Sequence, residues 1–99
     1  MKTRLAAPAS RQATRLHQWW RKNRLASPDL FARELEAARG FIANTPELGT
    51  VYAERQGTVV RRVLMPKTEN HVYYEIDREK GIAVILAVWG APKERGPKL

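Results

Sequence analysis

Three polar side chains alternate along one short segment of the chain, and their types can support acid–base chemistry. The segment HVYYEID spans residues 71–77 and carries His71, Tyr73 and Glu75 at every second position. Residues two apart in a β-strand point to the same face, so the alternation places an imidazole, a phenol and a carboxyl together. A cross-strand packing pair is the alternative outcome for such a face.

Three cations lie close to this segment in the sequence. Arg61 and Arg62 belong to the preceding apolar run, and Lys67 follows it. With His71 as a general base, these cations would surround a phosphate and stabilise its developing negative charge. The candidate catalytic set is therefore His71, Arg61, Arg62 and Lys67. The competing interpretation is that His71 and the two arginines form a solvated sheet face.

Metal and thiol chemistry have few candidate ligands. The chain has no cysteine and only two histidines, and His17 has no further ligand near it in the sequence. This excludes a disulfide framework and a thiolate zinc site. We expect no metal and no cofactor, so that stability comes from the apolar core or from a partner.

Two helices are predicted in the N-terminal half. Residues 1–6 have the pattern of an edge strand, and a helix can begin at Pro8. Apolar positions spaced i, i+4, i+7 and i+11 predict amphipathic helices over about 9–20 and 31–42. The sequence Ser27-Pro28-Asp29 predicts the N-cap and first position of the second helix.

Beyond these helices the pattern changes to short β runs, which predicts an α+β fold. An N-terminal strand, an α-helical hairpin and a three- to four-stranded antiparallel sheet would place the helices on one sheet face. The 99 residues leave room for one domain, residues 1–99. The run 82–89 is apolar on both faces, which predicts a central strand. The predicted strands are 51–54, 59–65, 71–77 and 82–89.

Two segments of the sequence bear on the cellular location. The apolar run 82–89 is too short for a membrane span, and residues 1–9 lack a signal-peptide core, so we expect a cytoplasmic protein.

The chain has 18 Lys and Arg against 10 Asp and Glu, a formal charge of +8. Residues 1–27 hold seven of the bases and no acid. Such a surface favours a polyanion or an acidic protein.

Three stretches resemble the RelE/ParE superfamily of toxins from bacterial toxin–antitoxin pairs. They are SPDLFARELEAARGFIANT (27–45), VRRVLMPKTENHVYYEID (60–77) and VILAVWGAPKERGPKL (84–99). The resemblance covers nearly the whole chain. It implies a toxin domain without a membrane partner, held in a hetero-oligomer by an acidic cognate antitoxin of the ParD type or similar.

Members of this family either cleave messenger RNA on the ribosome or inhibit DNA gyrase. RNA-cleaving relatives usually carry an arginine near the start of the strand that matches 71–76, and a tyrosine or His-Tyr pair near the C-terminus. Here His71 takes the place of that arginine, and no tyrosine or histidine follows Gly90. We therefore expect a gyrase inhibitor without a hydrolytic site. The alternatives are a ribosome-dependent mRNA endonuclease and a non-toxic module that binds nucleic acid.

The resemblance and the charge also imply interface residues. Tryptophan is enriched at interface hot spots; Trp20 lies on the predicted apolar stripe, and Trp19 lies at its edge. Trp89 ends the predicted central strand, where packing is the alternative to a stacking role. The expected target contacts are basic residues of the C-terminal tail, Lys93, Arg95 and Lys98. The expected antitoxin contacts are Trp19, Arg15, Lys22, Arg61, Arg62 and Trp89.

Overall fold

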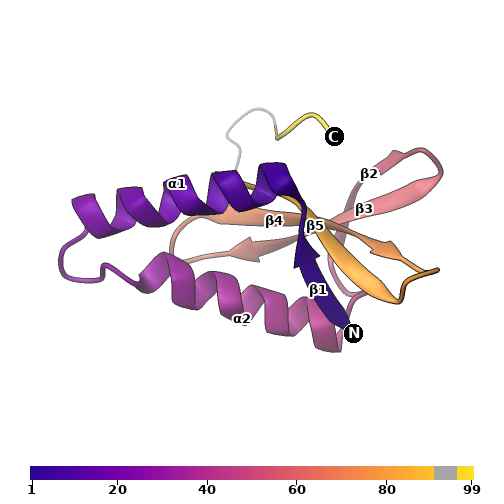
Figure 1. Ribbon diagram of the computed structural model, residues 1–99, viewed down its shortest axis with the longest axis horizontal. Helices are drawn as coiled ribbons and strands as arrows, with labels where there is room; N and C mark the ends of the chain where they lie inside the picture. The colour runs from indigo at the N-terminus through magenta and orange to yellow at the C-terminus, as the bar shows by residue number, and fades with distance from the viewer. Residues whose placement is uncertain (91–95) are drawn as a thin grey trace.

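One strand and two helices precede four consecutive strands (Figure 1). The structure is a computed structural model that describes residues 1–90 and 96–99. Its elements are β1 (Lys2–Leu5), α1 (Ala7–Asn23), α2 (Leu30–Asn44), β2 (Thr50–Arg55), β3 (Thr58–Met65), β4 (Asn70–Asp77) and β5 (Ile82–Gly90).

All five strands form one mixed sheet with the order β1-β5-β4-β3-β2. Strands β2 to β5 pair antiparallel in sequence order, whereas β1 pairs parallel with β5. The predicted antiparallel meander is confirmed with four strands, and the predicted N-terminal strand joins the same sheet as a fifth, parallel strand. A parallel pair needs a long connection, which the helices and the β2–β4 meander provide. The predicted places of β1 at an edge and of β5 inside the sheet are confirmed.

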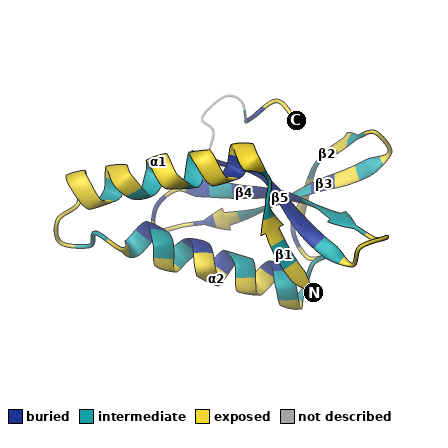
Figure 2. Cartoon of the chain, in the orientation of Figure 1, coloured by how far each residue is buried: buried dark blue, intermediate teal, exposed yellow. Residues whose placement is uncertain are grey.

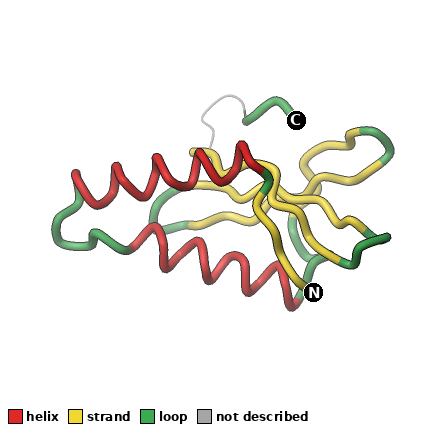
Figure 3. The backbone as a smooth tube through the Cα atoms, in the orientation of Figure 1, coloured by secondary structure: helices red, strands yellow, loops and turns green. Residues whose placement is uncertain are grey.

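Both helices pack on the same face of this sheet (Figures 1 and 3). The predicted stripe of α2 is confirmed, because Phe31, Leu35, Ala38 and Ile42 are all buried. On α1 only Ala9 is fully buried, and its outer side is exposed (Figure 2). Helix α1 therefore contributes a small buried area and a large exposed one. Neither helix has the length and apolar content of a membrane span in the described part of the chain.

The start of α2 differs from the prediction. The helix begins at Leu30, and its N-cap residue is Asp29, which makes no side-chain cap bond. Ser27 and Pro28 lie in the preceding turn, where the Ser27 carbonyl accepts a hydrogen bond from the Leu30 amide at 3.2 Å. The Asp29 carboxylate instead binds Arg21 at 3.1 Å. The predicted Ser27 cap is wrong, because the helix begins three residues later, after a turn that the Ser27 carbonyl closes.

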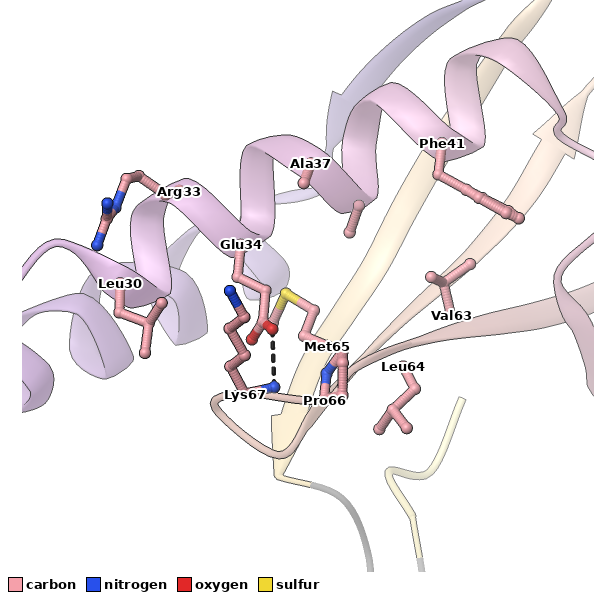
Figure 4. Close-up of a pocket in the computed structure, with 11 residues that line it drawn as sticks. Leu30, Arg33, Glu34, Ala37, Phe41, Val63, Leu64, Met65, Pro66 and Lys67 are labelled. Carbon is pink, nitrogen blue, oxygen red and sulfur yellow. Dashed lines mark hydrogen bonds between the residues drawn. The ribbon is translucent and has the colours of Figure 1, made fainter. Parts of the chain in front are cut away.

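A carboxylate on α2 fastens the β3–β4 turn (Figure 4). Glu34 accepts hydrogen bonds from the Lys67 amide at 2.8 Å and from the Thr68 amide at 2.9 Å. The Thr68 hydroxyl donates a third bond to the same carboxylate at 2.6 Å. Hydrogen bonds to a charged acceptor are stronger than neutral ones. The turn that leads into β4 is therefore held against α2.

Replacement of Glu34 by alanine is expected to lower the free energy of unfolding by about 2 kcal/mol, because two amides and one hydroxyl lose a charged acceptor. Urea unfolding measures this change. Glu36→Ala on the same helix is the matched control, since Glu36 makes a single exposed ion pair with Arg39 at 3.3 Å. That control is expected to change stability by less than about 0.5 kcal/mol. Equal losses in the two variants would contradict the account.

Candidate functional site

The sheet face opposite the helices gathers polar and aromatic side chains from neighbouring strands. The register pairs His71 with Trp89 and pairs Tyr73 with Arg62. Directly paired residues share a face of the sheet. Together with Tyr52 on β2, these four residues define what we call the open face.

Ring contacts order the open face. The Tyr52 and Tyr73 rings meet edge to face with centroids 4.7 Å apart, and the His71 and Tyr73 rings do so at 5.8 Å. The Arg62 guanidinium lies over the Tyr52 ring, 5.3 Å from its centroid. Edge-to-face pairs and cation–π contacts are favourable geometries for such groups. Arg62 is thus held beside the histidine and the two tyrosines.

A bulge in β5 shapes the middle of this face. Tyr73 pairs with Ala87, but Tyr74 pairs with Ile85, so Leu86 is an extra residue in β5. Leu86 and Ala87 consequently both belong to the apolar cluster around Tyr73. Bulges commonly redirect the side chains that follow them. This one keeps Trp89 on the open face beside His71.

The end of the chain crosses the open face. The Tyr52 hydroxyl donates a hydrogen bond to the Pro97 carbonyl at 3.1 Å. A Cβ atom at Gly96 would lie 2.5 Å from the Tyr52 hydroxyl and 2.9 Å from the Tyr73 hydroxyl, so only glycine fits there. Tyr73 is fully buried, and its hydroxyl has no hydrogen-bond partner within residues 1–90 and 96–99. The phenol of Tyr73 is therefore closed off from solvent.

His71 keeps a neutral imidazole at physiological pH. Burial first, and the charge of Arg62 second, hold the pKa of His71 below its ordinary value of 6.5. The Nδ1 atom is buried and finds no hydrogen-bond partner among the described residues. A neutral imidazole can accept a proton. His71 is accordingly the one group of the open face suited to act as a base.

The titration of His71 tests this arrangement. We expect its NMR midpoint to lie below 6.5 in the intact chain and to rise in Arg62→Gln without reaching 6.5, because burial is the larger cause. Below pH 6.5 the His71 imidazole is protonated more readily in the unfolded chain than in the folded one. The free energy of unfolding therefore falls as the pH drops from 6.5 to the lower pKa of the folded state. A midpoint at or above 6.5, or no rise in Arg62→Gln, would contradict the account.

The four candidate catalytic residues do not all meet. Arg61 points to the opposite side of β3 from Arg62, and its guanidinium donates a hydrogen bond to the Gly49 carbonyl at 2.9 Å. Lys67 lies in the β3–β4 turn that Glu34 holds against α2. The open face therefore brings together only His71 and Arg62 of that set.

The third member of the alternating polar segment has a separate role. Glu75 pairs with Arg55 of β2 at 3.4 Å. Its carboxylate is therefore engaged in an ion pair between strands rather than with His71.

The expected interface residues are spread over α1, the open face and the opposite side of β3, where Arg61 lies. Trp19 is 45% exposed near the end of α1, with the Arg24 guanidinium 4.9 Å from its ring centroid. Arg15 and Lys22 are exposed on the same helix. Trp89 is 40% exposed on the open face, where it borders a hollow of about 760 Å³ with Lys98. Lys93 and Arg95 lie outside the described residues.

Sequence reasoning missed a groove between α2 and β3 (Figure 4). Its volume is about 560 Å³, and Phe41 is 37% exposed beside it. The signal was available in the sequence, because the apolar Phe41 does not belong to the predicted buried stripe of its helix. We call this feature the α2–β3 groove, lined by Leu30, Arg33, Glu34, Ala37, Ala38, Phe41, Val63, Leu64, Met65, Pro66 and Lys67.

Comparison with known proteins identifies the architecture. Neither a family model nor a curated protein matches the chain. Among solved structures, a chain in the crystal structure of the toxin–antitoxin complex RelBE2 from Mycobacterium tuberculosis is similar. The two superpose with a TM-score of 0.60 and 24% sequence identity, over 92% of each chain. The chain shares its fold with that neighbour.

This shared fold confirms the predicted α+β class. The superposition covers nearly the whole chain, as the three resembling stretches do. Strand β3 contributes side chains to both surfaces, because successive residues of a strand point to opposite faces of the sheet. Arg62 faces the open face, whereas Val63 lines the α2–β3 groove.

Proposed function

We propose that the chain is the toxin of a toxin–antitoxin pair, held inactive by an acidic antitoxin. The observation that carries the proposal is the shared fold with a chain of a toxin–antitoxin complex, over 92% of both chains. The formal charge of +8 adds support, because complementary charge speeds association and favours an acidic partner.

The α2–β3 groove can hold an antitoxin segment with apolar and acidic side chains. Phe41 offers exposed apolar area beside it. Arg33 and Lys67 are exposed cations of its lining, whereas the carboxylate of Glu34 is already engaged by the β3–β4 turn. The groove therefore combines an apolar lining with free positive charge, the chemistry that an acidic amphipathic segment complements.

We further propose that the toxin inhibits DNA gyrase by binding to it. Cleavage of RNA needs both a base and an acid at the scissile phosphate. The described open face offers His71 as a base and Arg62 as a cation, while the phenol of Tyr73 is buried beneath Gly96. Inhibition by binding needs no acid–base pair, so this arrangement favours gyrase over messenger RNA.

A ribosome-dependent mRNA endonuclease is the second candidate, and one observation favours it. The neutral imidazole of His71 lies on the same face as the Arg62 guanidinium, as a base and a phosphate-binding cation would. The predicted endonuclease would lose cleavage in His71→Ala. Primer extension on translated messages detects such cuts.

One variant separates the two targets. We expect the purified chain to inhibit supercoiling of relaxed plasmid by gyrase in a dose-dependent way, and His71→Ala to inhibit equally. Undisturbed supercoiling at saturating protein would overturn the gyrase proposal. Cleaved messages that disappear in His71→Ala would establish the endonuclease instead.

A further inference from the structure

Three cations form a line along the outer side of α1. Arg11, Arg15 and Lys22 are separated by four and seven residues, which places them on one face of a helix. The line is about 16 Å long at 1.5 Å per residue. All three residues are exposed, and the helical period places them opposite the apolar stripe that begins at Ala9. The outer side of α1 is exposed in Figure 2. We call these three residues the basic stripe.

The charge of the basic stripe is not compensated within the described chain. None of the ion pairs found among residues 1–90 and 96–99 involves a stripe residue. The ion pair on this helix joins Arg21 to Asp29. Residues 1–27 contain no acid at all. The stripe therefore presents a positive field to solvent.

We propose that the basic stripe binds the phosphate backbone of duplex DNA without sequence preference. Duplex DNA is a stiff rod with one negative charge per about 1.7 Å of its axis, and a straight helix can lie along it. The inference is independent of the proposed toxin function. Under this proposal Arg15 and Lys22 contact DNA, instead of the antitoxin that the sequence analysis expected them to contact.

The surroundings of the stripe disfavour a protein partner. The core of a protein interface is apolar, and the exposed apolar side chain beside the stripe is Trp19, whose ring already packs against Arg24 and Trp20. Between the cations the outer side of α1 carries exposed Thr14 and Gln18. An acidic protein would gain charge contacts on the stripe but little buried apolar surface.

The neighbouring tryptophan disfavours single-stranded nucleic acid. Single strands are held by aromatic rings on which bases stack. Trp19 is the exposed aromatic residue beside the stripe, and its ring already contacts Arg24, at 4.9 Å, and the edge of Trp20, at 5.8 Å. Backbone contacts to a duplex need no free ring.

Fluorescence anisotropy with a labelled DNA duplex of about 24 base pairs tests the proposal. We compare the double variant Arg15→Gln/Lys22→Gln with the control Lys2→Gln/Lys80→Gln, which removes the same charge. Lys2 and Lys80 are exposed near the paired ends of β1 and β5 and lie outside α1. Circular dichroism and the urea midpoint confirm that both variants fold.

The expected result is a loss of affinity of about tenfold or more at 50 mM salt in the stripe variant. Between about 50 and 200 mM salt its plot of log affinity against log salt becomes shallower by about 1.8, since each lost phosphate contact contributes about 0.9. The control variant keeps the original slope and binds within about twofold of the intact chain.

Three results would overturn the proposal. Equal losses in the two variants would show a general charge effect. Tighter binding of the single strand of the same sequence would show a stacking site. Displacement of the duplex by poly-glutamate as effectively as by unlabelled duplex would assign the stripe to an acidic protein.

Discussion

Replacing Gly49 by alanine is expected to lower the free energy of unfolding by about 3 kcal/mol. A Cβ atom there would collide with the Tyr74 hydroxyl and lie 2.8 and 2.9 Å from two carbons of its ring. The ring cannot move aside, because Tyr74 is fully buried. Its hydroxyl donates to the Pro46 carbonyl at 2.6 Å and accepts a hydrogen bond from the Gly49 amide at 3.1 Å.

Gly40 provides the matched control for this substitution. It lies in α2, is exposed, and has no atom within 4 Å of an added Cβ. Alanine is a better helix former than glycine, so Gly40→Ala is expected to raise stability by about 0.5–1 kcal/mol. Urea unfolding of both variants measures the contrast. The account is wrong about the α2–β2 connection if Gly49→Ala is as stable as the intact chain.

Phe31→Ala is expected to lower the free energy of unfolding by about 4 kcal/mol, because the ring is 1% exposed and its loss leaves a cavity between α2 and the sheet. Phe41→Ala on the same helix is expected to cost less than about 1 kcal/mol, because that ring is 37% exposed beside the α2–β3 groove. Urea unfolding gives both values.

A conservative variant keeps this comparison informative. A domain of this size has a stability of about 5–15 kcal/mol, so Phe31→Ala can be largely unfolded at the lower end. Phe31→Leu retains most of the apolar volume and is expected to fold with a loss of about 1.5 kcal/mol or less. Equal costs at Phe31 and Phe41 would contradict the assignment of one ring to the core and the other to the groove.

Local periodicity explains how much of the fold was predictable. The spacing of Phe31, Leu35, Ala38 and Ile42 depends only on the helical period, and all four are buried as predicted. The apolar run of β5 likewise identified an interior strand. The parallel pairing of β1 with β5 was not predicted, because it joins segments about 80 residues apart. The short sequence of β1 contains no pattern that indicates which strand it pairs with.

The candidate site was predictable to a smaller extent. Alternation placed His71 and Tyr73 on one face, and the structure brings their rings to 5.8 Å. The same alternation places the side chains of Arg61 and Arg62 on opposite faces of the sheet, although both were expected to bind the same phosphate. The return of Gly96 and Pro97 across the open face was missed, since it depends on contacts between the chain's end and β2.

Growth after induction of the chain in a bacterial host tests the central proposal, that it is a toxin, most directly. The account predicts arrest within about one generation, and recovery when an antitoxin encoded beside the gene is expressed with it. Unchanged growth, with the folded chain accumulating to a level visible on an immunoblot, would contradict the account.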